Sequence, residues 1–126
     1  MVVDGLLYTK DHEWAKVEGD IVTMGITDYA QEQLGELVFV ELPEVGKEFV
    51  AHKEIAVVES SKAAGDVYCP VVGTVTEVNS ELTTKPELIN EDPYKGGWIC
   101  KLQVGDKASL DDLMDVKKYE EYLGTL

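Results

Sequence analysis

The sequence predicts a mostly β fold, a flattened barrel or sandwich of short strands with a few short helices around it. Two observations predict it. Apolar or alternating runs of strand length recur along the 126 residues, and turn residues separate them. No linker or low-complexity segment divides the chain, and a chain of this length typically forms one domain. We therefore expect a single domain over residues 1–126.

Strand-like runs account for most of the first 104 residues. One alternates directly after the Gly19-Asp20 turn, and another stops at Pro43, as expected where proline ends a strand. The predicted strands are 21–26, 37–42, 54–59, 67–72, 74–78 and 98–104. The spacing of the strands and turn residues favours a sandwich or barrel.

Three segments read as helical. The first spans 28–34, with Asp28 as a plausible cap and Gly35 as a stop, and residues 86–90 could form one turn behind Pro86. The last begins at a capping-box-like pair, Ser109 and Asp112, and ends at Gly124. Its apolar residues fall roughly on one face, so we expect it to pack against the outside of the sheet core.

The charge of the chain excludes several classes of function. Asp and Glu total 25 against eleven lysines, no arginine is present, and the formal net charge is -14. Nucleic acids and anionic membrane surfaces would be repelled, so neither is expected as a partner. Without arginine, no bidentate clamp for a phosphate is available, which disfavours a phosphoryl-transfer enzyme. A strongly acidic surface suits docking onto basic partners.

The cysteines and the chain start favour a reducing compartment. Cys69 and Cys100 form no C-x-x-C pair and lie in apolar runs, so we expect buried free thiols and no metal site. Residues 1–8 show neither a signal peptide nor a transit peptide. No apolar run approaches the roughly 18 residues of a membrane span. We expect a bacterial cytoplasmic protein, or a mitochondrial matrix protein in mature form.

The centre of the chain holds a candidate modification site. Two strand-like runs flank Ser60-Ser61-Lys62-Ala63-Ala64, which places Lys62 at or near the tip of a hairpin. Small neighbours would leave this amine open to a modifying enzyme. A lysine in a turn is ordinarily only a solvated charge, so the residue type alone does not decide between the two interpretations.

The segment around Lys62 resembles the lipoylation site of glycine cleavage H proteins. Four further blocks resemble that family in the same order, from about Leu7 to Tyr122, and five ordered blocks are far more specific than one. The blocks are His12-Glu13-Trp14; Gly25 to Ala30 with Leu34-Gly35; Val40 to Gly46; Glu59 to Pro70 with Gly73 and Glu77 to Asn79; and Pro86 to Tyr94 with Gly97-Trp98.

Three positions depart from the family pattern. Ser61 stands where an apolar residue is usual, Gly65 where serine or alanine is common, and Cys69 where a small residue is usual. Ser61 matters most because it adjoins the lysine that would be modified. None of the three removes Lys62 or shifts its spacing.

The resemblance implies a lipoyl-domain-like barrel-sandwich hybrid that carries lipoic acid in amide linkage on Lys62. It implies three partner enzymes that visit the arm: glycine decarboxylase (P protein), aminomethyltransferase (T protein) and dihydrolipoamide dehydrogenase (L protein). A lipoate ligase or an octanoyl or lipoyl transferase would attach the group, and the carrier is expected to be a monomer. The resemblance also implies that Glu13 and Asp66 help to shelter the loaded arm, because carboxylates suit a protonated amine.

Four other interpretations remain open. A biotin carrier also presents a lysine at a hairpin tip, but methionines normally flank that lysine, whereas Ser61 and Ala63 do so here. An H-like lipoyl relay or store for other enzymes would share the same scaffold, and an unmodified binding module would leave Lys62 inert. An enzyme with its own active site is least favoured, since His12 and His52 lack an accompanying nucleophile motif.

Overall fold

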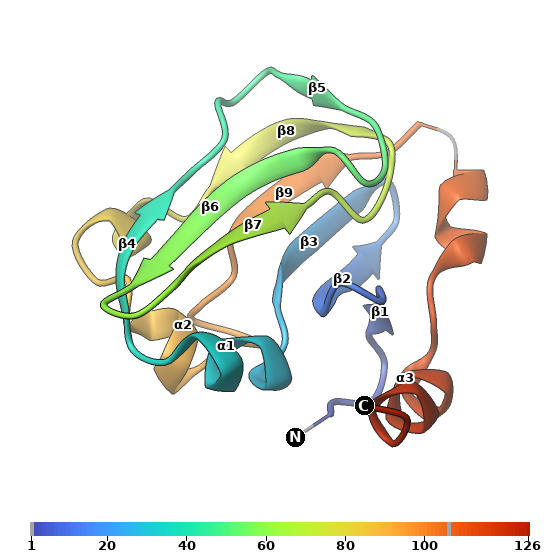
Figure 1. Cartoon of the computed structure of the whole chain (residues 1–126). Coiled ribbons are helices and arrows are strands. Elements are labelled where there is room, and N and C mark those ends of the chain that lie inside the picture. Colours follow the sequence, from blue (N-terminus) through green and yellow to red (C-terminus); the bar gives the residue numbers. More distant parts are fainter. Residues whose placement is uncertain (1, 106) are drawn as a thin grey trace.

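Two antiparallel sheets form the body of the protein. The structure is a computed structural model that describes residues 2–105 and 107–126. Six strands make the larger sheet, in the order β1 (Leu7–Tyr8), β2 (Glu13–Glu18), β3 (Ile21–Ile26), β9 (Cys100–Gln103), β8 (Gly73–Val78) and β5 (Glu48–Phe49). The smaller sheet contains β4 (Leu37–Glu41), β6 (Glu54–Ser60) and β7 (Ala64–Tyr68), in that order. The small sheet lies in front of the large one in Figure 1.

The core fills the space between the two sheets. Alternate residues of each strand point inward, as the two-residue period of a strand requires. Val22, Met24 and Leu102 come from the large sheet, and Val58 and Val67 from the small one; each is at most 1% exposed. The predicted mostly β sandwich is therefore confirmed.

The predicted strands match the structure best where turn residues bound them. Residues 21–26 form β3 as predicted. Strands β4, β6 and β8 each differ by one residue at one end from the predicted strands 37–42, 54–59 and 74–78. The predicted strand 67–72 was wrong: β7 starts at Ala64, because it continues directly from the hairpin turn, and ends at Tyr68. The strand at 98–104 is shorter, and β1, β2 and β5 were not predicted.

The helical segments lie at the edges of the sheets. Helix α1 (Asp28–Leu34) has the predicted bounds, but its cap is Thr27, whose Oγ1 accepts from the Ala30 amide at 3.3 Å. Gly35 ends it with φ of 85°. Helix α2 (Leu88–Glu91) begins two residues later than the turn predicted at 86–90, and a 3₁₀ turn, η1 (Ser80–Thr83), precedes it.

The C-terminal helix starts later than predicted. A 3₁₀ segment, η2 (Lys107–Asp112), comes first, and helix α3 (Val116–Leu123) begins after Asp115, whose carboxylate accepts from the Lys118 amide at 2.8 Å. The predicted start at Ser109 and Asp112 was therefore wrong for the helix, and the side chain of Ser109 lies outside the described part of the chain.

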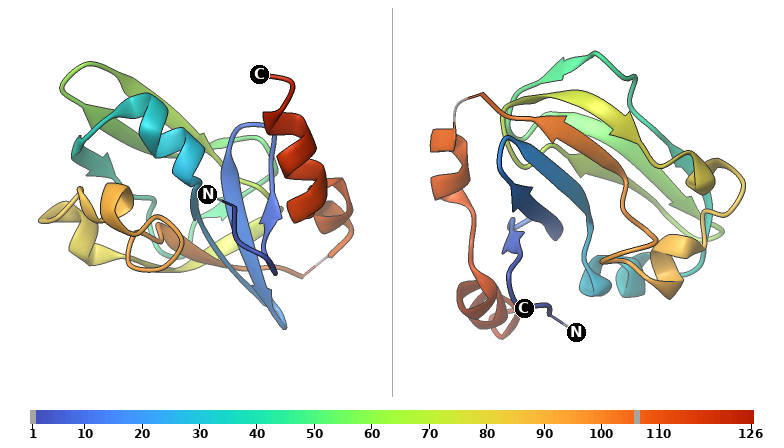
Figure 2. Two further views of the ribbon diagram at one scale, coloured as in Figure 1. Left: turned by 90° about the horizontal axis from the view of Figure 1, so that it is seen from below. Right: turned by 180° about the vertical axis from the view of Figure 1, so that it is seen from behind.

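Helix α3 packs on the outside of the large sheet, as predicted. Tyr119 is fully buried and stacks on Tyr8 with ring centroids 4.5 Å apart. Tyr8 and Met114 exchange two backbone hydrogen bonds, of 2.7 and 2.8 Å. Leu6 and Trp14 complete a second apolar cluster that is separate from the core between the sheets. Figure 2 shows this helix beside β1 and β2, away from the small sheet.

Candidate functional site: the β6–β7 hairpin

Lys62 lies at the tip of a tight hairpin, as predicted. Strands β6 and β7 pair up to Glu59 and Ala64, so residues 60–63 make the turn. The Ser60 amide donates to the Ala63 carbonyl at 2.8 Å. The Ser60 hydroxyl oxygen accepts from the amides of Lys62 at 3.3 Å and Ala63 at 3.1 Å. Serine favours such local turns, so one side chain fixes the backbone on which Lys62 stands.

The immediate surroundings leave the amine accessible. Lys62 is exposed, and so are Ser61, Ala63 and Ala64, which are all small. Its stem passes over Gly35: a Cβ built on that glycine would lie 3.0 Å from Lys62 Cε. A side chain at position 35 would require the flexible stem of Lys62 to move, and it would be strained at a positive φ.

A hydrogen-bonded connection holds the end of α1 beside the hairpin. The Asn90 side chain donates to the Gly35 carbonyl at 2.8 Å and to Gln31 Oε1 at 3.0 Å, and it accepts from the Leu37 amide at 2.9 Å. Asn90 of α2 thus fixes the loop that supports the stem of Lys62. Asn90 lies in one of the family blocks, but nothing in the sequence indicates this role.

Glu13 and Asp66 lie in different environments. Asp66 is exposed on β7, opposite Val57. Glu13 is only 1% exposed; Thr9 Oγ1 donates to it at 2.6 Å, and the Tyr68 amide donates to it at 3.3 Å. Burial raises the pKa of Glu13 to about 7, although both hydrogen bonds act to lower it. Glu13 therefore links β2 to the end of β7.

His12 has a packing role. Its backbone has φ of 68°, and its ring lies against Tyr29, with the centroids 4.4 Å apart. His12 Nδ1 and the Tyr119 hydroxyl are 2.8 Å apart, and that hydroxyl lies 2.9 Å from Thr27 Oγ1. Burial lowers the pKa of His12. The contacts join α3 to the cap of α1; sequence reasoning missed them because residues 12, 27 and 119 lie far apart.

His52 and the two cysteines lie in different environments. His52 is exposed in the loop before β6, and Cys69 and Cys100 are free and buried, as predicted. Among residues 2–105 and 107–126, no cluster of three His, Cys, Asp or Glu side chains could hold a metal ion. In the same part of the chain, no helix is long and apolar enough to cross a membrane.

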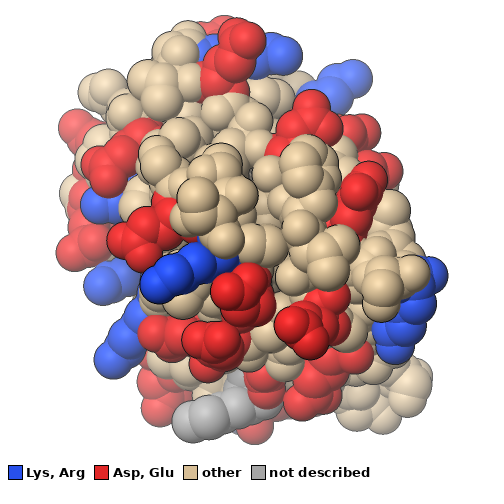
Figure 3. Space-filling view, turned by 90° about the vertical axis from the view of Figure 1, so that its left-hand side faces the viewer, with Lys and Arg blue, Asp and Glu red and all other residues tan. Residues whose placement is uncertain are grey.

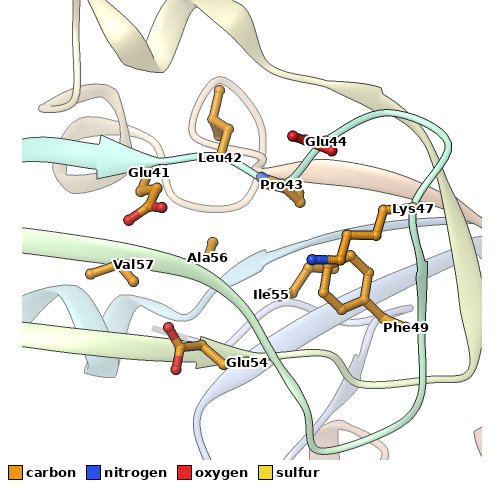
Figure 4. A pocket seen from close by; sticks show the side chains of 10 residues that line it. All are labelled: Glu41, Leu42, Pro43, Glu44, Lys47, Phe49, Glu54, Ile55, Ala56 and Val57. Atoms are coloured by element: carbon orange, nitrogen blue, oxygen red, sulfur yellow. The ribbon is translucent and has the colours of Figure 1, made fainter.

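The face at the hairpin end is acidic with apolar patches. Figure 3 shows the left side of Figure 1, where carboxylates surround an uncharged centre. Val38 and Phe39 on β4 are 60% and 49% exposed. Further along this edge, a pocket of about 360 Å³ is rimmed by glutamates, and Lys47 lies over the Phe49 ring with its Nζ 5.3 Å from the centroid (Figure 4).

Comparison with known proteins decides the family. Residues 6–125 match the glycine cleavage H-protein family. The chain belongs to that family. H proteins of Halothermothrix orenii and Caulobacter vibrioides are 53% and 56% identical to it; the alignments cover 97% and 94% of this chain and 95% and 98% of those proteins. A solved H protein from Mycobacterium marinum is 37% identical with a TM-score of 0.86, covering 98% of this chain and 99% of that one.

The H-protein match includes every part of the site described above. The hairpin, the end of α1, Asn90 and the α3 contacts all lie within residues 6–125. The predicted barrel-sandwich fold with its C-terminal helix is that of the solved H protein, over nearly the whole of both chains.

Proposed function

We propose that Lys62 carries a lipoyl group in amide linkage and that this group makes the protein a shuttle among the enzymes of glycine cleavage. As an H protein, the chain is a lipoyl carrier of the glycine cleavage system and not a catalyst. The observation that carries the assignment to Lys62 is its place at the exposed tip of a hairpin whose turn Ser60 fixes.

The residues around Lys62 fit this modification. The amine is exposed, small side chains flank it, and Gly35 leaves room for its stem. Acylation would remove one positive charge and change the formal charge from -14 to -15. The amide would not need a charge partner, whereas an ammonium favours one, so nothing at the tip opposes the change.

The lipoyl group would supply a dithiolane that takes up an aminomethyl fragment at glycine decarboxylase, delivers it to the aminomethyltransferase and is reoxidised by dihydrolipoamide dehydrogenase. The chain itself would supply position. A tethered group stays at high effective concentration near a docked partner, and a rigid turn keeps the attachment point outside the protein body. A monomer would leave the hairpin end free for each partner in turn.

Glu13 and Asp66 enter this proposal in different ways. Asp66 supplies an exposed carboxylate that could pair with a protonated amine at the end of the arm. Glu13 is 1% exposed and could reach such an amine only if the surface above it opened. We therefore expect Asp66→Asn to shorten the lifetime of the loaded arm more than Glu13→Gln does; unchanged lifetimes in both would remove the sheltering role.

A mass measurement tests the attachment site. The protein is incubated with lipoate, ATP and a lipoate ligase, and its intact mass is compared with those of Lys62→Ala and Lys85→Ala, another exposed lysine. We expect one lipoyl group on the wild type and on Lys85→Ala, and none on Lys62→Ala. A folded wild-type protein that gains no mass would contradict the proposal.

The proposed compartment is the bacterial cytoplasm. The relatives named above come from bacteria, which supports this location. Buried free thiols at Cys69 and Cys100 suit a reducing environment.

A further inference from the structure

A groove of about 260 Å³ lies on the outer face of the large sheet, apart from the hairpin tip. The right-hand view of Figure 2, from behind the molecule, turns this side of β2, β3 and β9 toward the viewer. The loop between α2 and β9 borders it. The groove is lined by both tryptophans of the chain, a tyrosine, a threonine, three lysines and one glutamate: Trp14, Trp98, Tyr94, Thr23, Lys16, Lys95, Lys101 and Glu18.

Residues in register on three neighbouring strands form the floor of the groove. Lys16 of β2 lies opposite Thr23 of β3, which in turn lies opposite Lys101 of β9. Residues in register on neighbouring strands share a face, so the two lysines flank the threonine. Trp14 lies over Gly25, where an added Cβ would be 2.8 Å from the indole nitrogen. The absence of a side chain at Gly25 therefore lets the indole lie close to the sheet.

The loop at 92–98 is fixed by hydrogen bonds, so its aromatic rings are held in position. The Asn79 side chain donates to the carbonyls of Gly96 at 2.9 Å and Trp98 at 2.8 Å. The Trp14 indole donates to the Pro93 carbonyl at 2.9 Å. A Cβ on Gly97 would lie 2.7 Å from Ile89 Cα, so this close approach to α2 requires glycine.

The lining reverses the charge balance of the chain. Lysines outnumber carboxylates three to one here, whereas acids exceed lysines by 25 to eleven in the whole sequence. Lys16 Nζ lies 4.0 Å from Glu18, and both side chains are more than half exposed, so the pair is weak. Glu77 of β8 lies opposite Lys101 in the register but does not line the groove. The pocket of Figure 4 has the opposite balance, with three glutamates and one lysine.

We propose that this groove binds a planar aromatic group that carries phosphate or carboxylate charge. The proposal goes beyond the lipoyl-carrier function and does not depend on Lys62. Trp98 and Tyr94 are half-buried and offer ring surface for stacking. Lys101 Nζ lies over the Trp98 ring, 5.4 Å from its centroid, so a ring that stacks on this face of the indole moves the ammonium to the ligand's edge, where it can meet the ligand's charge. Lysines suit a phosphate as point charges.

Both tryptophans line the groove, so intrinsic fluorescence reports directly on its occupation. Three probes separate the two parts of the proposed ligand: ATP has a ring and charge, adenosine a ring only, and tripolyphosphate charge only. We expect ATP to change the fluorescence saturably at micromolar to low millimolar concentration and to bind at least about tenfold more tightly than either other probe, a difference of about 1.4 kcal/mol. Calorimetry on the same samples checks the affinities.

Matched variants locate the binding. Lys95→Glu and Lys101→Glu should each weaken ATP binding at least about fivefold, since each replaces an attractive charge by a repulsive one. Lys47→Glu, at the other lysine that lies over an aromatic ring, should leave it unchanged. Circular dichroism verifies that the variants fold. Three results would each overturn the proposal. The first is the absence of a saturable fluorescence change with ATP. The second is that tripolyphosphate or adenosine binds as tightly as ATP, and the third is that Lys47→Glu and Lys95→Glu weaken ATP binding equally.

Discussion

At the scale of single residues, the site depends on side chains that hold backbone rather than on reactive groups. Ser60 fixes the turn with its hydroxyl, Asn90 fixes the loop at Gly35, and Glu13 fixes the end of β7. Asn90 and Glu13 join segments that lie far apart in the sequence, whereas the contacts of Ser60 stay within its own turn. Lys62 itself is exposed and contributes a point of attachment.

Ser60→Ala tests whether the turn matters for modification. It removes the acceptor for the Lys62 and Ala63 amides in an exposed turn, so we expect stability to fall by no more than about 1 kcal/mol. The rate at which a lipoate ligase modifies Lys62 at low substrate concentration should fall several-fold, because the lysine is less well placed. Ser61→Ala is the control: Ser61 is exposed, and its hydroxyl makes no hydrogen bond in the described structure. Equal rates in both variants would contradict the role of Ser60.

Glu13 makes stability depend on pH. Its pKa is about 7 in the folded protein against 4.5 for an unperturbed glutamate, so the folded state binds the proton more tightly. The stabilisation is complete below about pH 4.5 and is lost as pH rises through 7. Glu13→Gln mimics the protonated form, and its stability relative to wild type should rise by about 1–3 kcal/mol between about pH 5 and about pH 8.

Urea unfolding at both pH values measures the effect of Glu13→Gln. Asp66→Asn, which removes an exposed carboxylate on β7, is the control for the loss of a carboxylate as such. Parallel pH profiles for wild type and Glu13→Gln would show that burial does not perturb this group.

At the scale of elements, the sequence predicted what local signals specify. Helix α1 was placed correctly because a capping residue and Gly35 mark its ends, yet its cap was assigned to Asp28 and is Thr27. Two adjacent residues that both favour capping cannot be separated without the backbone conformation. The start of β7 at Ala64 was missed because Ala64 and Gly65 have weak strand preference, and pairing with β6 decides their structure.

In the candidate site too, local features could be predicted from the sequence, and contacts between distant segments could not. Lys62 could be predicted because a hairpin tip and the ordered family blocks are visible in the sequence. The partners of Glu13 could not, because Thr9 and Tyr68 reach it only through the turn before β2 and the packing of β7. The groove on the outer sheet face was also missed, since strand register brings Lys16 and Lys101 together across Thr23.

Tyr119→Phe tests the connection between α3 and α1. It keeps the stacking on Tyr8 but removes the hydroxyl shared by His12 and Thr27. Because two polar groups lose a partner next to a buried ring, we expect a loss of about 1–3 kcal/mol in thermal or urea unfolding. Tyr122→Phe, which removes an exposed hydroxyl bonded to the Lys10 carbonyl at 3.3 Å, should cost less than about 0.5 kcal/mol. Similar losses in the two variants would contradict the connection.

At the scale of the whole molecule, charge is unevenly arranged. Carboxylates are abundant on the face at the hairpin end (Figure 3), and Val38 and Phe39 of β4 are exposed. The groove lined by three lysines lies on the outer face of the large sheet. Complementary charge speeds the encounter of two proteins and fixes their orientation more than it sets affinity. A partner that reaches Lys62 therefore meets an acidic surface first, and a basic rim on that partner would be favoured.

Charge reversal tests whether this acidic face guides docking. Glu59 pairs with Phe39 across β4 and β6, and Glu36 adjoins Gly35, so both are exposed carboxylates close to Lys62. Glu36→Lys and Glu59→Lys should each lower kcat/KM for lipoylation several-fold at low salt, and the difference from wild type should shrink as salt screens the charges. Glu120→Lys on α3 makes the same charge change away from the hairpin and should have little effect. If all three variants lost activity equally, net charge alone, and not the face around Lys62, would control the encounter.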